Sequence, residues 1–340
     1  MASMVFMLLC GGQGKRLWPL SRKSKPKQLL QMISGKTLLE NTIDRLVSFE
    51  DADIGLVTTK SYVQAIDTCL GDKVDFYVVE PCARNTAAAI ALGVEQVLKS
   101  NDTDPVMVFL PSDHYIGDNQ AFAQAIEVAI AHAKNHDDIV LVGIKPTYPA
   151  TGYGYAATHQ LDQADILKVI KFHEKPDLQT AENYLEHGNV FWNAGIFVAR
   201  ASVLHHAIKT NQPELHQSIF KYVHEMGDYQ DVPALSFDRA VIEHCTNVSL
   251  VPGEFPWKDV GSIENFTELF VGAQKDASVF SHKGHSNIAC STKKMIVFLG
   301  VSDVCLVETD DVIVVMQRGQ AEAMSDVVAH LEKGPMENLL

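Results

Sequence analysis

Residues 5–16 read VFMLLCGGQGKR, and this stretch decides the fold of the chain. Its apolar first half is too short to cross a membrane and predicts a buried β-strand. The three glycines that follow predict a loop at the carboxyl end of that strand. Glycine allows a sharp turn and brings backbone N–H groups close to a bound anion. Basic side chains then surround the loop, at Arg16, Arg22, Lys25 and Lys27. Together these features predict a cradle for a polyphosphate.

Two well-known glycine-rich phosphate loops fit this stretch poorly. A dinucleotide-binding loop needs a third glycine where Leu17 stands, and a Walker A loop needs serine or threonine where Arg16 follows Lys15. Taken alone, a glycine turn after a strand is more often structural than functional. A binding role therefore depends on what the rest of the chain contains.

Apolar runs and helical patterns alternate through the first half of the chain. We expect strands at 54–57, 74–79, 106–110 and 139–144, and helices at 37–47, 62–70, 87–98 and 122–133. This alternation predicts an α/β fold with a Rossmann-like mixed, mainly parallel sheet and helices on both faces. Ligands of such sheets bind outside the carboxyl ends of the strands. We therefore expect the glycine loop, residues 80–86 and Asp113 to converge at one edge.

The second half of the chain changes character. We expect a glycine turn at 148–155 that enters a strand, further strands at 166–172, 191–198 and 248–251, and helices at 181–185, 203–208, 214–226 and 237–245. Further on, short strands are expected near 288, 295–299, 304–307 and 312–316, before a closing helix at 321–331. The expected division is a large domain over 1–270 that carries the site, and a small β-rich, β-helical C-terminal domain over 271–340. The small domain is expected to pack against a second copy of the chain in a homodimer.

The composition is that of an ordinary globular enzyme, with 340 residues, 46% hydrophobic and 21% charged. The net charge of −14 argues against a nucleic-acid partner, although not against nucleotide binding, because the basic residues near residue 20 are locally concentrated. The six cysteines form none of the closely spaced pairs of a zinc or redox site, and no pair among the fourteen histidines is convincing as a metal site. With no secretory leader or membrane-spanning run recognised, these features predict a cytoplasmic protein with no membrane partner.

Several strings resemble one family. Residues 16–22 (RLWPLSR) and 26–28 (PKQ) resemble the signature of sugar-1-phosphate nucleotidylyltransferases, and above all their mannose-1-phosphate guanylyltransferase branch. Similar strings recur as EPCARNT at 80–86, TGYGY at 151–155, EKP at 174–176 and WKDVG at 257–261. The resemblance extends over residues 4–330. One departure is Ala88, where members of the family usually have proline, and alanine is a good helix former.

The resemblance implies a nucleotide site. Its residues are Gly11, Gly12, Gly14, Lys15, Arg16, Lys27, Glu80, Arg84, Asn85 and Thr86. Without the resemblance, residues 80–86 could equally be the end of a strand and the cap of a helix. A capped helix N-terminus at the active edge of a sheet is itself a natural position for an anion.

The resemblance also implies a sugar-phosphate site and a metal site. The sugar-phosphate residues are Gly152, Glu174, Lys175 and Asn193, with Lys175 on the phosphate and Glu174 on sugar hydroxyls. Asp113 and Asp259 are the implied ligands of Mg²⁺, which prefers carboxylate, phosphate and water oxygens. Asp113 has the alternative role of a turn former, and the Glu174 tripeptide that of an exposed turn. Asn193 interrupts an apolar strand, where an unbonded amide costs about 1–3 kcal/mol and a sugar hydroxyl would be a suitable partner.

The implied activity is transfer of GMP from GTP to α-D-mannose 1-phosphate, giving GDP-mannose and pyrophosphate. Arg16, Lys27 and Asp113 are the implied catalytic residues, which align the phosphates and neutralise charge during an in-line attack. One alternative is a related transferase with another hexose or nucleotide. Another is a non-catalytic nucleotide-sensing subunit, which would be expected to have lost Lys27, Asp113 or Asp259. Larger relatives carry a following phosphomannose isomerase domain, and this chain is expected to end before one and to have a single activity.

Overall fold

The computed structural model describes residues 3–32, 34–100, 103–159, 164–273, 279–290, 294–336 and 339–340. The contacts divide the chain into two compact units. The larger unit contains residues 1–11, 43–112 and 116–257, and the smaller unit contains residues 12–42, 113–115 and 258–340. The units interleave along the chain, and residue 270 lies inside helix α9 (Ile263–Ala273). A division into separately folding domains at 1–270 and 271–340 stays a prediction.

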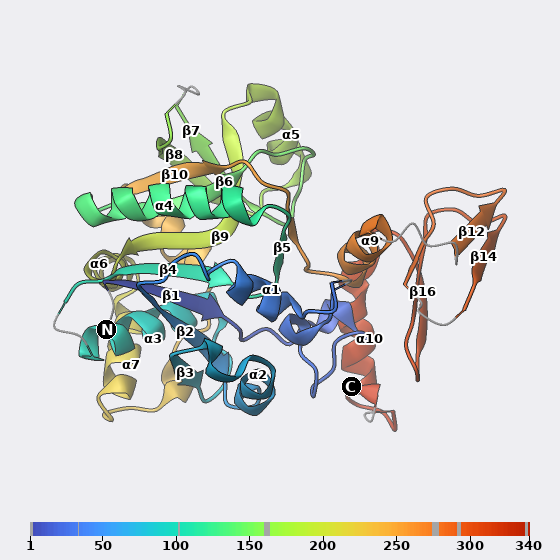
Figure 1. Ribbon diagram of the computed structural model, residues 1–340, viewed down its shortest axis with the longest axis horizontal. Coiled ribbons are helices and arrows are strands. Elements are labelled where there is room, and N and C mark those ends of the chain that lie inside the picture. Colours follow the sequence, from blue (N-terminus) through green and yellow to red (C-terminus); the bar gives the residue numbers. More distant parts are fainter. Residues whose placement is uncertain are drawn as a thin grey trace. The chain divides into compact units, whose positions relative to one another are not determined.

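Strand β1 (Met4–Leu9) lies in the parallel half of a nine-stranded sheet (Figure 1). The strand order is β3-β2-β1-β4-β9-β6-β10-β8-β7. Strand β1 pairs in parallel with β2 (Ala52–Thr59) and β4 (Val106–Pro111), and β2 pairs in parallel with β3 (Phe76–Glu80). The middle of β1, residues 5–8, is fully buried, as expected for a strand covered on both faces.

The other half of the sheet is largely antiparallel. Its strands are β6 (Ile139–Ile144), β7 (Gly154–Thr158), β8 (Leu167–Glu174), β9 (Val190–Arg200) and β10 (Val248–Gly253). Strand β9 runs antiparallel to both β4 and β6, while β10 is parallel to β6. The expected α/β class, with a mixed sheet between helices, is confirmed.

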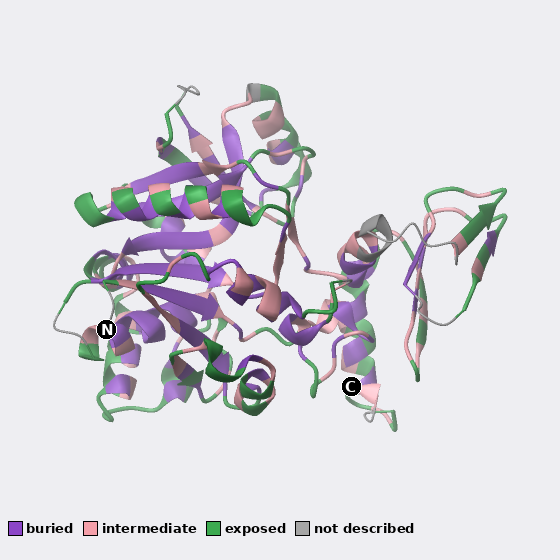
Figure 2. Cartoon of the chain, viewed as in Figure 1, coloured by how far each residue is buried: buried purple, intermediate pink, exposed green. Residues whose placement is uncertain are grey.

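Helices cover both faces of the sheet (Figure 1). One face carries α3 (Asn85–Ser100), α6 (Ala201–Asn211) and α7 (Pro213–Val223), and the other carries α4 (Asn119–Asn135). The sides of these helices that face the sheet are buried (Figure 2). Helix α3 packs closely against β1. Gly93 allows this approach, since a Cβ atom there would lie only 3.0 Å from Cε of Met7. No helix among the described residues is both long and apolar enough to cross a membrane.

Shorter helical elements complete the two units. They are α1 (Leu38–Asp44), α2 (Val63–Leu70), α5 (Leu178–His187), α8 (Phe237–Ala240) and the 3₁₀ turns η1 (Lys15–Leu17), η2 (Lys27–Leu29), η3 (Gly71–Lys73), η4 (Tyr229–Asp231), η5 (Ile242–His244) and η6 (Ala321–Ala323).

The C-terminal part of the smaller unit is rich in short strands, as expected. These are β12 (Val279–His282), β13 (Ile288–Cys290), β14 (Ile296–Leu299), β15 (Val304–Glu308) and β16 (Ile313–Gln317), followed by helix α10 (Met324–Leu331). Strand β12 pairs in parallel with β14, and β13 with β15. Val279 is opposite Ile296 and Ile288 is opposite Cys305, so both pairings have the same offset along the chain. An equal offset of this kind is typical of stacked β-helical coils, and the β-helical character expected for this region stays a prediction.

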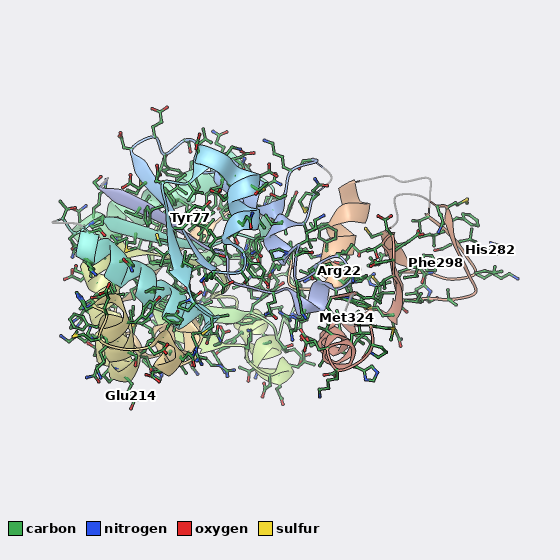
Figure 3. All side chains as sticks on the ribbon, turned by 90° about the horizontal axis from the view of Figure 1, so that it is seen from below. Arg22, Tyr77, Glu214, His282, Phe298 and Met324 are labelled. Carbon is green, nitrogen blue, oxygen red and sulfur yellow. The ribbon has the colours of Figure 1, made fainter. Side chains whose placement is uncertain are left out.

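The residues after the glycine loop help to build the core of the smaller unit. Leu17 and Trp18 are buried in one apolar cluster with Met324 of α10. The indole Nε1 of Trp18 donates a hydrogen bond of 2.8 Å to the carbonyl oxygen of Leu339, and Arg22 bonds to the same carbonyl. Figure 3 labels Arg22 and Met324 among these side chains. The RLWPLSR string therefore has a packing role beside any role in binding.

Three expected helices end earlier than the pattern predicts, and one of them, expected at 37–47, is α1 and ends at Asp44. The helix expected at 237–245 is two pieces, α8 and η5, because Val241 between them has a φ of −123° that is not helical. The helix expected at 214–226 is α7 and ends at Val223, since Glu225 has a φ of +59° and cannot continue a right-handed helix.

Three short strands are absent from the expectations. They are β12, β5 (His114–Ile116) and β11 (Trp257–Asp259), of which the last two pair with each other. Strands of three or four residues are too short to show an alternating pattern in the sequence.

Candidate active site

The glycine loop begins at the end of β1 in the larger unit. The backbone N–H of Cys10 donates a hydrogen bond of 2.8 Å to the carbonyl of Val57, which continues the pairing of β1 with β2. At Gly11, a Cβ atom would lie 3.5 Å from Oε2 of Glu80. The structure thus brings Gly11 and Glu80, two of the predicted nucleotide-binding residues, to the same place.

Gly14 is required by the backbone of the smaller unit. Its φ is +69°, and a Cβ atom there would lie 2.7 Å from Cβ of Lys27. Its carbonyl accepts a hydrogen bond of 2.7 Å from Oγ of Ser21. Gly12, by contrast, has open space where a side chain would be. The loop is therefore shaped so that Lys27 can approach it closely.

Lys27, Asp113 and Asp259 form a compact charge cluster in the smaller unit. The ammonium Nζ of Lys27 lies 3.0 Å from Oδ2 of Asp113 and 3.4 Å from Oδ1 of Asp259. His114 joins the cluster, with Nε2 3.6 Å from the same Asp259 oxygen. The lysine side chain is only 12% exposed and those of the two aspartates 17% and 29%. Three predicted site residues from distant parts of the chain are thus brought together.

The electrostatics of this cluster favour its charged form. Burial acts to lower the pKa of Lys27, but the carboxylates of Asp113 and Asp259 outweigh it and leave the pKa above its usual value. Burial acts to raise the pKa of Asp259, but Lys27 and then His114 outweigh it and leave that pKa below its usual value. The ammonium and the Asp259 carboxylate therefore both stay ionised near neutral pH.

The same two carboxylates suit a hard divalent cation. Both point an oxygen at one positive centre, here the ammonium of Lys27, so a second cation can be shared in the same way. Carboxylate oxygens are the ligands Mg²⁺ prefers, and it leaves its remaining positions to phosphates and water. The residues present therefore fit the predicted Mg²⁺ site.

Lys15 and Arg16 have partners near the C-terminus of the described chain. Nη1 of Arg16 lies 2.6 Å from Oε1 of Glu322, and Nζ of Lys15 lies 2.8 Å from Oε1 of Glu332. Both pairs are well exposed, and exposed pairs contribute about 0–1 kcal/mol. These two cations can therefore exchange their partners for a phosphate at little cost.

Residues 80–86 of the larger unit end a strand and begin a helix. Strand β3 ends at Glu80 and α3 begins at Asn85, whose Oδ1 accepts a hydrogen bond of 2.8 Å from the N–H of Thr86. Nη2 of Arg84 donates to the carbonyl of Gln230 at 2.6 Å. The buried Nε of Arg84 has no hydrogen-bond partner among the described residues.

Glu80 is held in place by Tyr229. The Tyr229 hydroxyl donates a hydrogen bond of 2.6 Å to Oε1 of Glu80, which is 2% exposed. Burial raises the pKa of Glu80, although the bonds from Tyr229 and from the backbone of Arg84 act in the opposite direction. Burial and the nearby Glu80 carboxylate also raise the pKa of Tyr229. Tyr229 thus keeps its proton and holds one oxygen of the glutamate.

The predicted sugar-phosphate residues lie in the larger unit. Glu174 is buried at the end of β8, and Lys175 is exposed beside it with Nζ 3.4 Å from Oε1 of Glu174. Gly152 has open space where a Cβ would stand. Asn193 of β9 already has partners in the protein: its Nδ2 donates to Oδ1 of Asp238 at 2.7 Å, and its Oδ1 accepts from the N–H of Gly195 at 3.0 Å. The fold thus supplies one partner to each end of this buried amide, and its contact with a sugar hydroxyl stays a prediction.

Residues 235–243, which we call the linking segment, contact both groups of predicted residues in the larger unit. The N–H of Phe237 donates to Oγ1 of Thr86 at 2.9 Å. Asp238 accepts from Asn193, and Oε1 of Glu243 accepts from the N–H of Glu174 at 2.7 Å. Sequence reasoning missed these residues, because two acids in a helix-like pattern look like an ordinary solvated face.

Asp238 is the most perturbed carboxyl of this group. Burial, with the nearby Glu174 carboxylate adding to it, raises the pKa of Asp238 to about 7. Bonds from its own backbone N–H and from Asn193, and the Lys175 charge, act in the opposite direction but are smaller. The carboxyl therefore changes its charge within the physiological range of pH.

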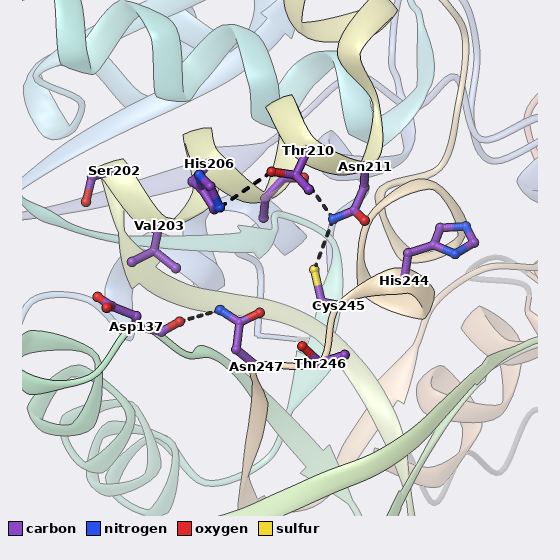
Figure 4. Close-up of a pocket in the computed structure, with 11 residues that line it drawn as sticks. Asp137, Ser202, Val203, His206, Thr210, Asn211, His244, Cys245, Thr246 and Asn247 are labelled. Carbon is purple, nitrogen blue, oxygen red and sulfur yellow. Dashed lines mark hydrogen bonds between the residues drawn. The ribbon is translucent and has the colours of Figure 1, made fainter.

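A separate cavity of about 520 Å³ lies in the larger unit (Figure 4). It is bounded by α6 and by the segment that leads into β10. Its polar contacts include a bond of 3.5 Å from Nδ2 of Asn211 to Sγ of Cys245 and one from Asn247 to the backbone of Asp137. None of the predicted site residues lines this cavity. The volume of a cavity therefore does not by itself identify the predicted active site.

The fold and the charge clusters define an α/β enzyme of phosphate chemistry, with a glycine loop after β1 and paired aspartates beside a lysine. Residues 5–276 match the nucleotidyl transferase family, and the chain belongs to that family. It is a nucleotidyltransferase.

Named relatives cover nearly all of the chain. The mannose-1-phosphate guanylyltransferase RfbM of Salmonella typhimurium is 32% identical, over 96% of this chain and 72% of its own length. The xanthan biosynthesis protein XanB of Xanthomonas campestris is 33% identical, over 98% of this chain and 74% of its own length. Among solved structures, the mannose-1-phosphate geranyltransferase of Thermus thermophilus is 29% identical with a TM-score of 0.83, and the match covers 97% of this chain and 99% of that one.

Proposed function

We propose that this protein transfers GMP from GTP to α-D-mannose 1-phosphate and releases pyrophosphate. The observation that carries the proposal is the cluster of Lys27 with Asp113 and Asp259, which joins a cation and two carboxylates at contact distance. The choice of guanine and mannose rests on the relatives with that printed activity. One similar structure carries a geranyltransferase name, but the family match is to nucleotidyl transfer, and a charged cluster suits polyphosphate better than an apolar chain.

The proposed reaction is a single in-line displacement. A phosphate oxygen of the sugar phosphate forms a bond to the α-phosphorus of GTP, while the bond from that phosphorus to the pyrophosphate oxygen breaks. The attacking oxygen is already an anion, so no general base is needed. The protein must instead align the phosphates and offset their charge.

The predicted side chains divide that task among them. Lys27 and Arg16 bind phosphate oxygens of the nucleotide, and Lys175 orients the attacking phosphate. Asp113 and Asp259 hold Mg²⁺, which supplies positive charge to the reacting phosphates when it is bound. Glu80 and the Arg84–Thr86 turn receive the nucleoside, and Glu174 and Asn193 receive the sugar. Partners in the fold, namely Tyr229 for Glu80 and Asp238 for Asn193, support the orientation of the side chains that make these contacts.

The direct test is pyrophosphate release measured for every pairing of four nucleoside triphosphates with mannose 1-phosphate and glucose 1-phosphate. GTP with mannose 1-phosphate is expected to have the highest kcat/KM, and activity is expected to disappear in chelator. A preference for another pair would point to a related transferase. Nucleotide binding without release of pyrophosphate would point to a sensing subunit.

We also propose that the C-terminal strands mediate a homodimer. Large apolar side chains of β12, β14 and β16 are exposed in the smaller unit, among them Phe280 at 51%, Leu299 at 67% and Val315 at 64%. Exposed apolar strands of this kind are typical of interfaces or of aggregation. Light scattering on the purified chain is expected to give twice the chain mass, and Leu299→Lys with Val315→Lys is expected to reduce it to the monomer mass.

A further inference from the structure

Three helices of the larger unit bring two imidazoles and a carboxylate to one point. Glu95 lies on α3, His205 on α6 and His216 on α7. The Nε2 atoms of His205 and His216 are 2.9 Å apart, and Oε2 of Glu95 is 3.7 Å from Nε2 of His205. One ligand atom from each of the three residues lies within 4.8 Å of the other two. The spacing of these residues along the chain did not indicate this group, because the packing of the helices creates it.

The charge of Glu95 has no lysine or arginine partner in the described structure. Its side chain is 11% exposed, and its ion-pair contacts are with Nε2 of His205 and, at 3.4 Å from its other oxygen, with Nε2 of His224. An imidazole in its neutral form does not compensate the charge of a buried carboxylate, whose desolvation costs several kcal/mol when it is unpaired. A bound cation between the carboxylate and the imidazoles would compensate it.

The distances are close to those of a metal site. Two imidazole nitrogens bonded to one zinc ion at about 2.0–2.1 Å are about 3.3 Å apart when the coordination is tetrahedral. The rings of His205 and His216 would therefore have to separate by only a few tenths of an ångström. Both side chains are partly exposed, so an ion can reach the site from solvent.

We propose that Glu95, His205 and His216 bind a divalent transition-metal ion, and zinc is the ion that we test. Imidazole nitrogen with carboxylate oxygen is a common zinc ligand set, whereas Mg²⁺ prefers oxygen ligands alone. Water or the nearby His224 completes the coordination. The site is separate in its residues and its chemistry from the Asp113–Asp259 pair, and it ties α3, α6 and α7 together.

The test is zinc binding by full-length protein without a histidine tag, after metal has been removed. Competition with a chromophoric chelator is expected to show one tight site per chain. His205→Ala and His216→Ala are each expected to weaken that site by about 100-fold or more, since even the partners of metal ligands are worth about 10–100-fold. Glu95→Gln, which keeps the shape of the side chain, is expected to weaken it as well.

His206→Ala is the matched control. It is the next residue on α6, and its ring lines the cavity of Figure 4, where it lies 3.5 Å from Oγ1 of Thr210. This variant is expected to bind zinc like the wild type. Zinc is expected to raise the melting temperature of the wild type and of His206→Ala, but not of His205→Ala.

Cobalt gives a second measurement that needs no variant to fold. Co²⁺ bound by nitrogen and oxygen is expected to show visible d–d bands without the intense near-ultraviolet bands of thiolate ligation. If no stoichiometric site is found, the proposal is overturned, and His205 and His216 are a hydrogen-bonded pair of imidazoles without a metal. Zinc binding that is unchanged in both histidine variants, or cobalt spectra with thiolate bands, would overturn it too.

Discussion

The protonation state of Lys27 depends on its surroundings. Burial opposes its charge, and two carboxylates at 3.0 and 3.4 Å restore it. The same contacts keep the Asp259 carboxylate ionised against its own burial. A lysine held in this way is already oriented before substrate arrives, which is what electrostatic stabilisation of a reacting phosphate requires.

The first prediction concerns this lysine. Lys27→Ala is expected to lower kcat/KM for GTP by about 100- to 1,000-fold, the usual cost of losing one preoriented charge contact. Steady-state release of pyrophosphate measures the effect. Lys23→Ala, which removes an exposed lysine four residues earlier, is the control and is expected to stay near the wild type. Near-normal turnover of Lys27→Ala would remove Lys27 from the site.

The second prediction concerns Asp238, whose pKa is about 7 in the folded protein because of burial and of the nearby Glu174 carboxylate. The usual value is 3.8, so between these two values of pH the folded state holds a proton that the unfolded chain has lost. The contribution of this proton to stability is complete below pH 3.8 and is lost as the pH rises through 7.

Asp238→Asn removes that titration and keeps an oxygen that can accept from Asn193. Relative to the wild type, the free energy of unfolding of this variant is expected to rise between about pH 5 and pH 7.5 and then to level off. Urea unfolding at a series of pH values measures the difference. A constant difference across this range would show that Asp238 titrates normally.

At the scale of elements, the linking segment shows how one short stretch positions several others. It contains only one turn of α8 and the 3₁₀ turn η5, yet it bonds Thr86 at the start of α3, Asn193 in β9 and Glu174 at the end of β8. Such partners act through the residues that they orient. Changing them should therefore alter one substrate more than the other.

The third prediction uses this distinction. Glu243→Ala leaves the N–H of Glu174 without its acceptor, a loss of about 1–3 kcal/mol, and the end of β8 is expected to shift. The KM for mannose 1-phosphate is expected to rise about tenfold, the equivalent of about 1.4 kcal/mol, while the KM for GTP changes little. Glu182→Ala, which removes an exposed glutamate of α5, is the control. An equal rise in both KM values would indicate a general structural role.

At the scale of the whole molecule, the smaller unit is assembled from three separate parts of the chain. Each part supplies one member of the charge cluster: Lys27 from the first, Asp113 from the second and Asp259 from the third. The two aspartates are expected to act through a single Mg²⁺, so their contributions should not be independent.

The fourth prediction tests this dependence. Asp113→Asn and Asp259→Asn are each expected to reduce turnover sharply at saturating Mg²⁺. For the double variant, the increase in activation free energy is expected to be much smaller than the sum of the increases for the two single variants, because both aspartates act through one ion. Strictly additive losses, or full activity of the wild type in chelator, would contradict a shared metal.

Much of this protein is determined by its sequence alone. A covered α/β sheet is specified by the apolar runs of β1 and β4 and by the helical pattern of α3. Burial of apolar surface stabilises a strand or a helix only where the spacing of the apolar residues matches the period of that element. The glycine loop and its basic residues indicate phosphate chemistry in the same way. A positive φ at Gly14 and its close approach to Lys27 are what such a glycine predicts.

Only the tertiary structure decided which side chains meet. The bonds of Asn193 with Asp238, of Glu174 with Glu243 and of Glu80 with Tyr229 join residues 45, 69 and 149 positions apart. No local pattern encodes these pairs, since each follows from the packing of whole elements whose register and separation depend on the entire core. The meeting of His205 and His216 beside Glu95 has the same origin. Periodicity reports which face of an element is buried, and packing alone determines what that face touches.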